Sequence, residues 1–361
     1  MALHQRFFNL RAALSRSFAK ICAPRSISIL LYHGVPLRAR HPGGLDAGCF
    51  EEQVRFLAHN FTLVGAGWQA MKPAALQRPR VLLTFDDGFR NNAEVAAPIL
   101  RKYRVPAMFF VASRHTKAGK YLWFSYLSAL LFHFRGSGFL FRGRLVDMSG
   151  NREAAIQRLA NELLGLRPHP AAMYQAIEEE LPALEDFVPR QELRANFEGM
   201  SPQQIRDLAA DPLFTIGAHT VDHPYLTSCE PKVAQFEIRE NKRQLEEVTG
   251  KACATVAYPH NDYSPAILEY CRRIGFASGY SVHQQLHLDP ELEIARVGVF
   301  SPSLTILTLK ALWGTRMQRH REAVMPTADG RSLDEGEPSP LAVEGASLEP
   351  DFPRPPLRSF P

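Results

Sequence analysis

Two short segments of the chain contain side chains that a metal-assisted hydrolase needs. Residues 84–88 read T-F-D-D-G and contain the adjacent carboxylates Asp86 and Asp87, and residues 219–223 read H-T-V-D-H. One carboxylate and two imidazoles can hold a divalent ion and leave positions open for water and substrate. The other carboxylate is then available as a base, so the pattern favours hydrolysis at a metal centre.

Each segment follows a short apolar run that is typical of a buried strand. The run 81–85 ends at Asp86, and the run 213–218 ends at His219. Ligands of α/β folds bind beyond the carboxyl ends of the strands, so both segments are expected at one site. Each segment also has a simpler interpretation. An Asp-Asp-Gly turn can cap a helix, and two histidines four residues apart are often solvated.

With these motifs, the chain resembles the polysaccharide deacetylases of carbohydrate esterase family 4, the NodB homology type. Both T-F-D-D-G and H-[ST]-x-x-H are intact and occur in the family's order. The resemblance continues more loosely in the segments 29–35, 106–111, 257–260 and 295–299. It covers about residues 26–300, apart from a middle insertion.

The resemblance implies a role for each motif residue. Asp87, His219 and His223 would hold a divalent metal, most commonly zinc in this family. Asp86 would be the general base that takes the proton of the attacking water, and the reaction would remove the acetyl group of an N-acetylated sugar in a polysaccharide or glycan precursor. A bound metal lowers the pKa of water towards ~7, so a carboxylate can accept that proton at neutral pH.

The third motif of the family, R-x-P-[FY], is altered in this chain. Residues 257–260 read A-Y-P-H, so the proline is present, the arginine is absent and His260 replaces the aromatic residue. The backbone N–H of His260 is still available as an oxyanion donor. Arg296, in a strand-like stretch, is the candidate to pair with Asp86 in place of the missing arginine, and an ordinary surface arginine is the alternative.

The general acid has two candidates. The family places this histidine late in the domain in an L-x-H setting, for which the chain offers only His287, with His283 nearby in a Gln-rich stretch. Some permuted relatives draw the acid from the N-terminal strand, and His33 ends the strand-like run 26–33. His33 is the preferred candidate, and a histidine that only forms a hydrogen bond at the strand end is the alternative.

The remaining pattern predicts a distorted, incomplete (β/α)7 barrel. Strand-like runs alternate with helical patterns, which is typical of βα units around a parallel sheet. The expected strands are 26–33, 80–85, 105–112, 213–218, 253–258, 276–281 and 293–299. Helices are expected over 50–60, after a capping box at 201–204, from 231 to a glycine cap at 250, and between 264 and 275.

The domain organisation is predicted in three parts. Residues 1–25 form a basic amphipathic segment, 26–320 the deacetylase domain, and 321–361 a disordered, proline-rich tail. Within the domain, residues 115–200 form a helical insertion that opens with an aromatic stripe around Trp123 and Phe124. This stripe is expected to pack against the barrel, or else to form a lid or sugar-stacking wall. The later helices of the insertion are expected to be surface-like.

The composition limits the classes of partner and the cellular location that we expect. The net charge of +5 is concentrated in the N-terminal segment, which fits an interfacial helix at an anionic membrane or a helix packed on the barrel, and no nucleic-acid motif is present. That segment lacks the apolar core of a signal peptide. Five cysteines without C-x-x-C spacing are typical of reduced thiols, so a cytoplasmic location is expected, with peripheral contact at the inner membrane surface. The sequence gives no oligomeric state.

Two further functions are compatible with the same residues. A non-haem iron oxygenase could use Asp87, His219 and His223 as a facial triad, although Asp86 would then have no role. A catalytically silent carbohydrate-binding relative would explain the altered third motif. The adjacent base and the intact metal motifs favour the deacetylase.

Overall fold

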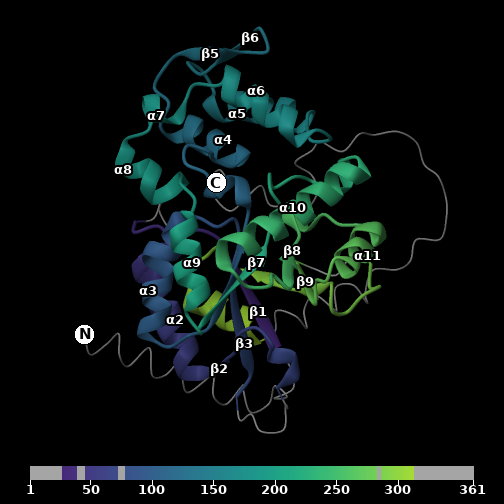
Figure 1. Cartoon of the computed structure of the whole chain (residues 1–361). Coiled ribbons are helices and arrows are strands. Elements are labelled where there is room, and N and C mark those ends of the chain that lie inside the picture. Colours follow the sequence, from purple (N-terminus) through teal and green to yellow (C-terminus); the bar gives the residue numbers. More distant parts are fainter. Residues whose placement is uncertain (1–26, 39–44, 72–77, 283–285, 313–361) are drawn as a thin grey trace, which may run out of the picture.

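The apolar runs of the sequence form parallel strands that curl into a nearly closed barrel (Figure 1). The computed structural model describes residues 27–38, 45–71, 78–282 and 286–312. The parallel strands in this part are β1 (Ile27–Tyr32), β2 (Thr62–Leu63), β3 (Arg80–Phe85), β4 (Ala107–Val111), β7 (Phe214–Ala218), β8 (Thr255–Ala257), β9 (Ser278–Ser281), β10 (Ile294–Ala295) and β11 (Val297–Gly298). The expected strands are therefore present, and the fold is the predicted distorted (β/α)7 barrel.

One short segment brings the two edges of the sheet together. The strand order is β10-β9-β8-β7-β4-β3-β1-β11, and β2 pairs with β3. Ile294 pairs with Tyr280 of β9, whereas Val297 pairs with Leu30 of β1. The stretch expected as one strand, 293–299, is thus two short strands that switch partner at Arg296.

Alternation along the strands separates two apolar layers. Leu83 and Phe85 of β3 belong to the large cluster between sheet and helices, whereas Leu82 belongs to a smaller cluster with Phe110 and Tyr280. Side chains alternate across a strand, so the smaller cluster fills the barrel interior. Residues 82, 84 and 86 share one face, which directs Asp86 toward the interior at the carboxyl end of β3.

The four helices that the sequence predicts are present, although the first begins at Ala47, three residues earlier than expected, and the helices at 97–102 and from 304 were not predicted. The helices of the barrel are α2 (Ala47–Asn60), α3 (Ala97–Lys102), α9 (Pro202–Ala210), α10 (Pro231–Thr249) and α11 (Pro265–Arg273), and a further helix begins at residue 304. Ser201 and Gln204 form the predicted capping box. Gly250 ends α10 in the left-handed conformation with φ 66°, as expected for a glycine cap.

The insertion forms a helical lobe at one end of the barrel (Figure 1). Its elements are α4 (Trp123–Phe132), the hairpin β5 (Gly138–Phe141) and β6 (Arg144–Asp147), α5 (Arg152–Leu164), α6 (Pro170–Glu180), α7 (Leu184–Phe187), α8 (Arg190–Glu192) and a π-helical turn (Leu193–Phe197). The aromatic residues of α4 pack mainly into the lobe's own apolar cluster, to which Ile156 of α5 and Tyr174 of α6 contribute. The later helices are therefore not simply surface elements, because their apolar faces complete this second core.

Other sequence predictions concern parts without structural description. The basic segment 1–25 and the tail 321–361 lie outside the described residues, so the proposed division of the chain stays a prediction. None of the helices in the described part has both the length and the apolar character that a membrane crossing requires. The cysteines of this part, Cys49, Cys229, Cys253 and Cys271, are all free thiols.

Candidate active site

The T-F-D-D-G segment forms a tight turn that separates the two carboxylates. Asp86 extends the line of β3, because its N–H donates to the carbonyl of Tyr32 in β1 at 3.0 Å. Asp87 and Gly88 then adopt positive φ values of 71° and 78°. A Cβ at Gly88 would lie 2.8 Å from Cγ1 of Val111, so this position requires glycine for space as well as for backbone conformation. The turn caps no helix, and both carboxylates are buried.

Arg296 holds Asp86 from the junction of β10 and β11, where the barrel closes. Its Nη1 and Nη2 atoms donate to Oδ1 and Oδ2 of Asp86 at 2.6 and 2.8 Å, and Nη1 also lies 3.4 Å from Oγ1 of Thr84. Arg296 is 1% exposed and its guanidinium lies over the ring of Phe110. Arg296 therefore forms a buried bidentate ion pair with the candidate base, and the surface-arginine interpretation is wrong.

The two histidines converge on Asp87. Nε2 of His219 lies 3.5 Å and Nε2 of His223 lies 3.3 Å from Oδ1 of Asp87. These ligand atoms lie within 4.8 Å of one another, and all three residues are buried. Two ligand atoms about 2.05 Å from a tetrahedral zinc are about 3.3 Å apart, so these side chains fit a metal ion between them.

The tautomer of His219 suits a metal ligand. Its Nδ1 lies 2.9 Å from the carbonyl oxygen of Ala257, to which an Nδ1–H can donate. Nε2 then has its lone pair free on the side of Asp87. The backbone N–H of His219 donates to Oδ1 of Asn241 in α10 at 2.9 Å. Hydrogen bonds therefore fix both the backbone and the ring of His219.

The electrostatics keep both carboxylates ionised. Burial favours the neutral form of Asp86, but Arg296, together with His219 and His33, outweighs burial and lowers its pKa below the ordinary value. The pKa of Asp87 is lowered further: burial alone would raise it, but the imidazoles of His219, His223 and His33 together outweigh burial. Burial lowers the pKa of His223 and so favours the neutral imidazole that a metal needs.

Backbone strain accompanies the histidine motif. Thr220 and His223 have positive φ values of 64° and 53°. The left-handed conformation is unusual for a β-branched residue and is found where a functional site over-determines the backbone. The Oγ1 of Thr220 accepts the N–H of His223 at 3.1 Å, which closes the turn between the two histidines.

The insertion supplies one wall of the site. The ring of Phe124 lies 5.3 Å from that of His223, and the ring of Trp123 lies 6.0 Å from that of His260. His260 stacks on Tyr225 with 3.9 Å between ring centroids and lies 4.5 Å from His223. Burial and the neighbouring His223 hold the pKa of His260 well below its usual range. Most of the aromatic stripe therefore packs into the lobe's own core and not against the barrel, while Trp123 and Phe124 contact the histidines of the site. A lid or sugar-stacking role stays a prediction.

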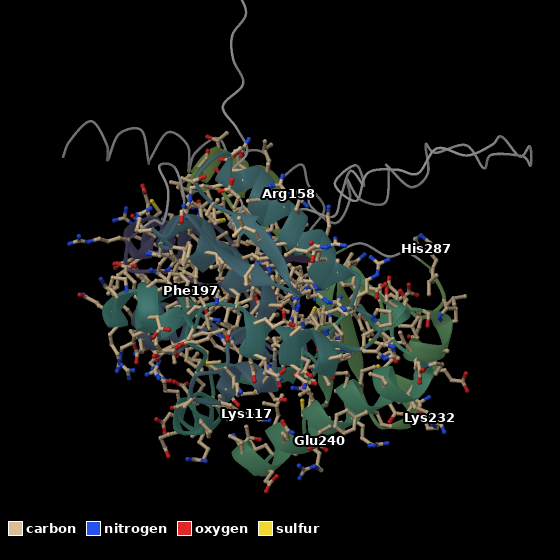
Figure 2. All side chains as sticks on the ribbon, turned by 90° about the horizontal axis from the view of Figure 1, so that it is seen from above. Lys117, Arg158, Phe197, Lys232, Glu240 and His287 are labelled. Carbon is tan, nitrogen blue, oxygen red and sulfur yellow. The ribbon has the colours of Figure 1, made fainter. Side chains whose placement is uncertain are left out.

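The two candidate acids lie in different places. His33 follows β1, whose last residue, Tyr32, pairs with Phe85 of β3, so His33 and Asp86 leave neighbouring strands at the same level. Its ring lies 5.9 Å from that of Phe300. His287 is exposed, at the edge of the molecule in Figure 2, in a loop whose backbone N–H groups bind Glu293. The structure therefore brings His33, and not His287, to the site, while His283 lies outside the described residues.

One buried histidine that contacts the Asp87 turn belongs to none of the sequence motifs. Nδ1 of His115 lies 3.3 Å from the carbonyl oxygen of Asp87, and Nε2 lies 2.7 Å from that of Phe197. Gly199 packs so closely on His115 that a Cβ there would lie 1.9 Å from its carbonyl oxygen. His115 therefore links the end of the insertion to the Asp87 turn. No sequence signal marks it, because its partners are backbone groups.

The sequence profile of the polysaccharide deacetylase family matches residues 74–279, more than half of the chain. The chain therefore belongs to the polysaccharide deacetylase family. This places it among hydrolases of the N-deacetylase class, whose substrates are N-acetylated glycans. A search of curated proteins finds no relative with significant similarity.

Solved structures resemble the chain at low identity. IcaB from Ammonifex degensii is 18% identical with a TM-score of 0.50, over 79% of this chain and 97% of that one. The Streptococcus pyogenes deacetylase PplD, solved with acetate, is 17% identical with a TM-score of 0.49, over 78% of this chain and 97% of that one. The first likeness agrees with the barrel architecture described above.

Proposed function

We propose that this chain is a zinc-dependent hydrolase that removes the acetyl group from an N-acetylated amino sugar in a polysaccharide or glycan precursor. The observation that carries the proposal is the convergence of Asp87, His219 and His223 next to a separate carboxylate, Asp86, which a buried arginine keeps ionised. This separation gives the adjacent acids different tasks, one as ligand and one as base.

Asp87, His219 and His223 would hold the ion. Zinc in such a site acts as a Lewis acid that lowers the pKa of a water towards ~7 and polarises the amide carbonyl. Asp86 lies 3.9 Å from Nε2 of His219 through its Oδ2 atom, close enough to take the proton of a water beside the ligands. Arg296 orients Asp86 through both carboxylate oxygens.

Two more residues complete the proposed reaction. The backbone N–H of His260 would donate to the oxygen that becomes negative during attack. His33 would protonate the departing amine, since it follows β1 at the carboxyl end of the sheet, next to the carboxylates. Phe300, beside His33, is 40% exposed and offers an aromatic face for a sugar ring.

The place of action is also a proposal. Contact of the N-terminal basic segment with an anionic membrane surface would bring the enzyme to a lipid-linked or nascent glycan on the cytoplasmic side.

Acetate release from N-acetylglucosamine oligomers tests the proposal. Zinc-loaded protein is compared with the same protein after chelation and after zinc is restored. We expect release that disappears with the metal and returns with it. A protein that binds zinc and oligomer but never releases acetate would instead be a silent carbohydrate-binding relative.

A further inference from the structure

Asp222, between the two histidine ligands, is held through all of its polar groups. Its N–H donates to Oε2 of Glu237 at 2.8 Å, and its carbonyl accepts the hydroxyl of Tyr174 at 3.1 Å. Its carboxylate pairs with Nη1 of Arg114 at 3.2 Å. Asp222 is only 8% exposed, so these contacts are made away from water. The residue is therefore a fixed point of the turn that carries His219 and His223.

The insertion provides some of the contacts that hold Asp222. Tyr174 lies in α6, is 1% exposed, and its hydroxyl also accepts the N–H of Trp123 at 3.2 Å. The hydroxyl thus bridges the first residue of α4 and the metal-ligand turn. Tyr174 joins, through one oxygen atom, the wall of the site to the backbone between the two histidines.

Arg114 is positioned by the same helix. Its guanidinium lies 3.8 Å from the centroid of the Tyr174 ring, and it pairs with Glu178, one turn further along α6. Glu178 also pairs with Lys120 at 2.6 Å. Residues of α6 therefore determine where Arg114 meets Asp222.

The turn needs such external contacts. Left-handed backbone is unfavourable for residues other than glycine, so the φ values of Thr220 and His223 persist only where the surroundings impose them. Glu237 accepts the N–H of Val221 at 3.0 Å as well as that of Asp222. The barrel holds the turn through Glu237 and Arg114. The insertion adds the hydroxyl of Tyr174 and the carboxylate of Glu178, which pairs with Arg114.

We propose that Tyr174 and Glu178 of the insertion are positioning residues for the metal centre, acting through Asp222 and Arg114 on the geometry of His219 and His223. The insertion is then part of the metal site, in addition to lining it. This inference rests on the proposed metal site.

Zinc affinity of the Tyr174→Phe variant tests the proposal without any turnover assay. The change removes one hydroxyl and keeps the buried ring. Outer-sphere partners of metal ligands typically contribute about 10–100-fold in affinity, so we expect zinc to bind about 10-fold more weakly. The absorption spectrum of the cobalt-substituted protein should also change, because the histidines shift around the ion.

Tyr126→Phe is the matched control, since Tyr126 is buried in α4 and makes none of these contacts with Asp222. It should bind zinc as the unmodified protein does.

Glu178→Gln provides a second variant that leaves the buried core intact. It removes the charge facing Arg114, and we expect a smaller loss of zinc affinity, with Glu185→Gln in the same insertion as the unaffected control. If Tyr174→Phe fails to fold, Glu178→Gln decides. Unchanged zinc affinity and an unchanged cobalt spectrum in the folded variants would overturn the inference. An unmodified protein that binds no zinc would instead refute the proposed metal site.

Discussion

Arg296 and Asp86 form a buried bidentate ion pair between residues 210 positions apart in the chain. The pair exists because β10 and β11 close the barrel, so that the residue between them points at the end of β3. Both charged groups are desolvated, so each is stabilised by its pairing with the other. Arg296, between β10 and β11, thus occupies the position beside the base that the missing arginine of the third motif would take.

Replacement of Arg296 by glutamine should move the acidic limb of the pH profile. Without the guanidinium, burial raises the pKa of Asp86, so the base is protonated over a wider range and kcat/KM begins to fall at a higher pH. The loss of one partner should also destabilise the fold by about 3–5 kcal/mol. Arg101→Gln, at a solvent-exposed pair with Asp211, should cost no more than about 1 kcal/mol and leave the profile in place. An unshifted acidic limb in Arg296→Gln would exclude this role.

Alanine at His33 and at His287 should give opposite outcomes. His33→Ala removes the proposed proton donor, and turnover should fall about 10²–10⁴-fold while zinc binding stays intact. His287→Ala changes an exposed side chain and should leave turnover unchanged. Steady-state kinetics with zinc content measured on the same samples checks both. Full activity of His33→Ala would show that His33 does not donate the proton to the leaving amine.

The buried Glu237 should make the protein less stable as the pH rises. Burial and the nearby Asp222 raise the pKa of Glu237 to about 8, from an ordinary value of 4.5. Between these values the folded protein holds a proton that the unfolded chain releases, so the free energy of unfolding falls with increasing pH. Glu237→Gln should flatten this fall between about pH 5 and pH 8 in denaturant titrations. Glu240→Gln, at a partly exposed position of α10 (Figure 2), should keep the original slope because Glu240 is ionised in both states over this range. Equal slopes in all three proteins would show that Glu237 does not control this dependence.

Two glycines with similar backbone angles should respond differently to alanine. Gly67 and Gly88 have φ values of 81° and 78°. A Cβ at Gly67 meets nothing within 4 Å, so Gly67→Ala should cost only the backbone term of about 1 kcal/mol. At Gly88 the Cβ would also press on Val111, so Gly88→Ala should cost more and weaken zinc binding by displacing Asp87. Equal unfolding free energies for the two variants would argue against this tight packing.

The sequence predicted the elements that obey local rules and missed those created by tertiary contacts. Buried parallel strands such as β3 read as apolar runs, and Ser201 and Gly250 mark helix ends through their capping chemistry. The motifs predicted which residues meet at the carboxyl ends of the strands. The hairpin of β5 and β6 was missed, because Leu140 and Leu145 are exposed and leave no alternating pattern. The roles of Tyr174 and His115 depend on backbone partners far away in the chain, which no spacing reveals.

The most direct test of the account compares Asp86→Asn with Asp87→Asn. Both variants replace a carboxylate by an amide of the same shape, one residue apart. Zinc stoichiometry and acetate release from N-acetylglucosamine oligomers are measured for each. The account predicts that Asp86→Asn keeps its zinc and loses turnover by at least about 10²-fold, as expected for a missing general base. Asp87→Asn should lose zinc and turnover together. Loss of zinc from Asp86→Asn, or undiminished turnover in either variant, would contradict the assignment of base and ligand.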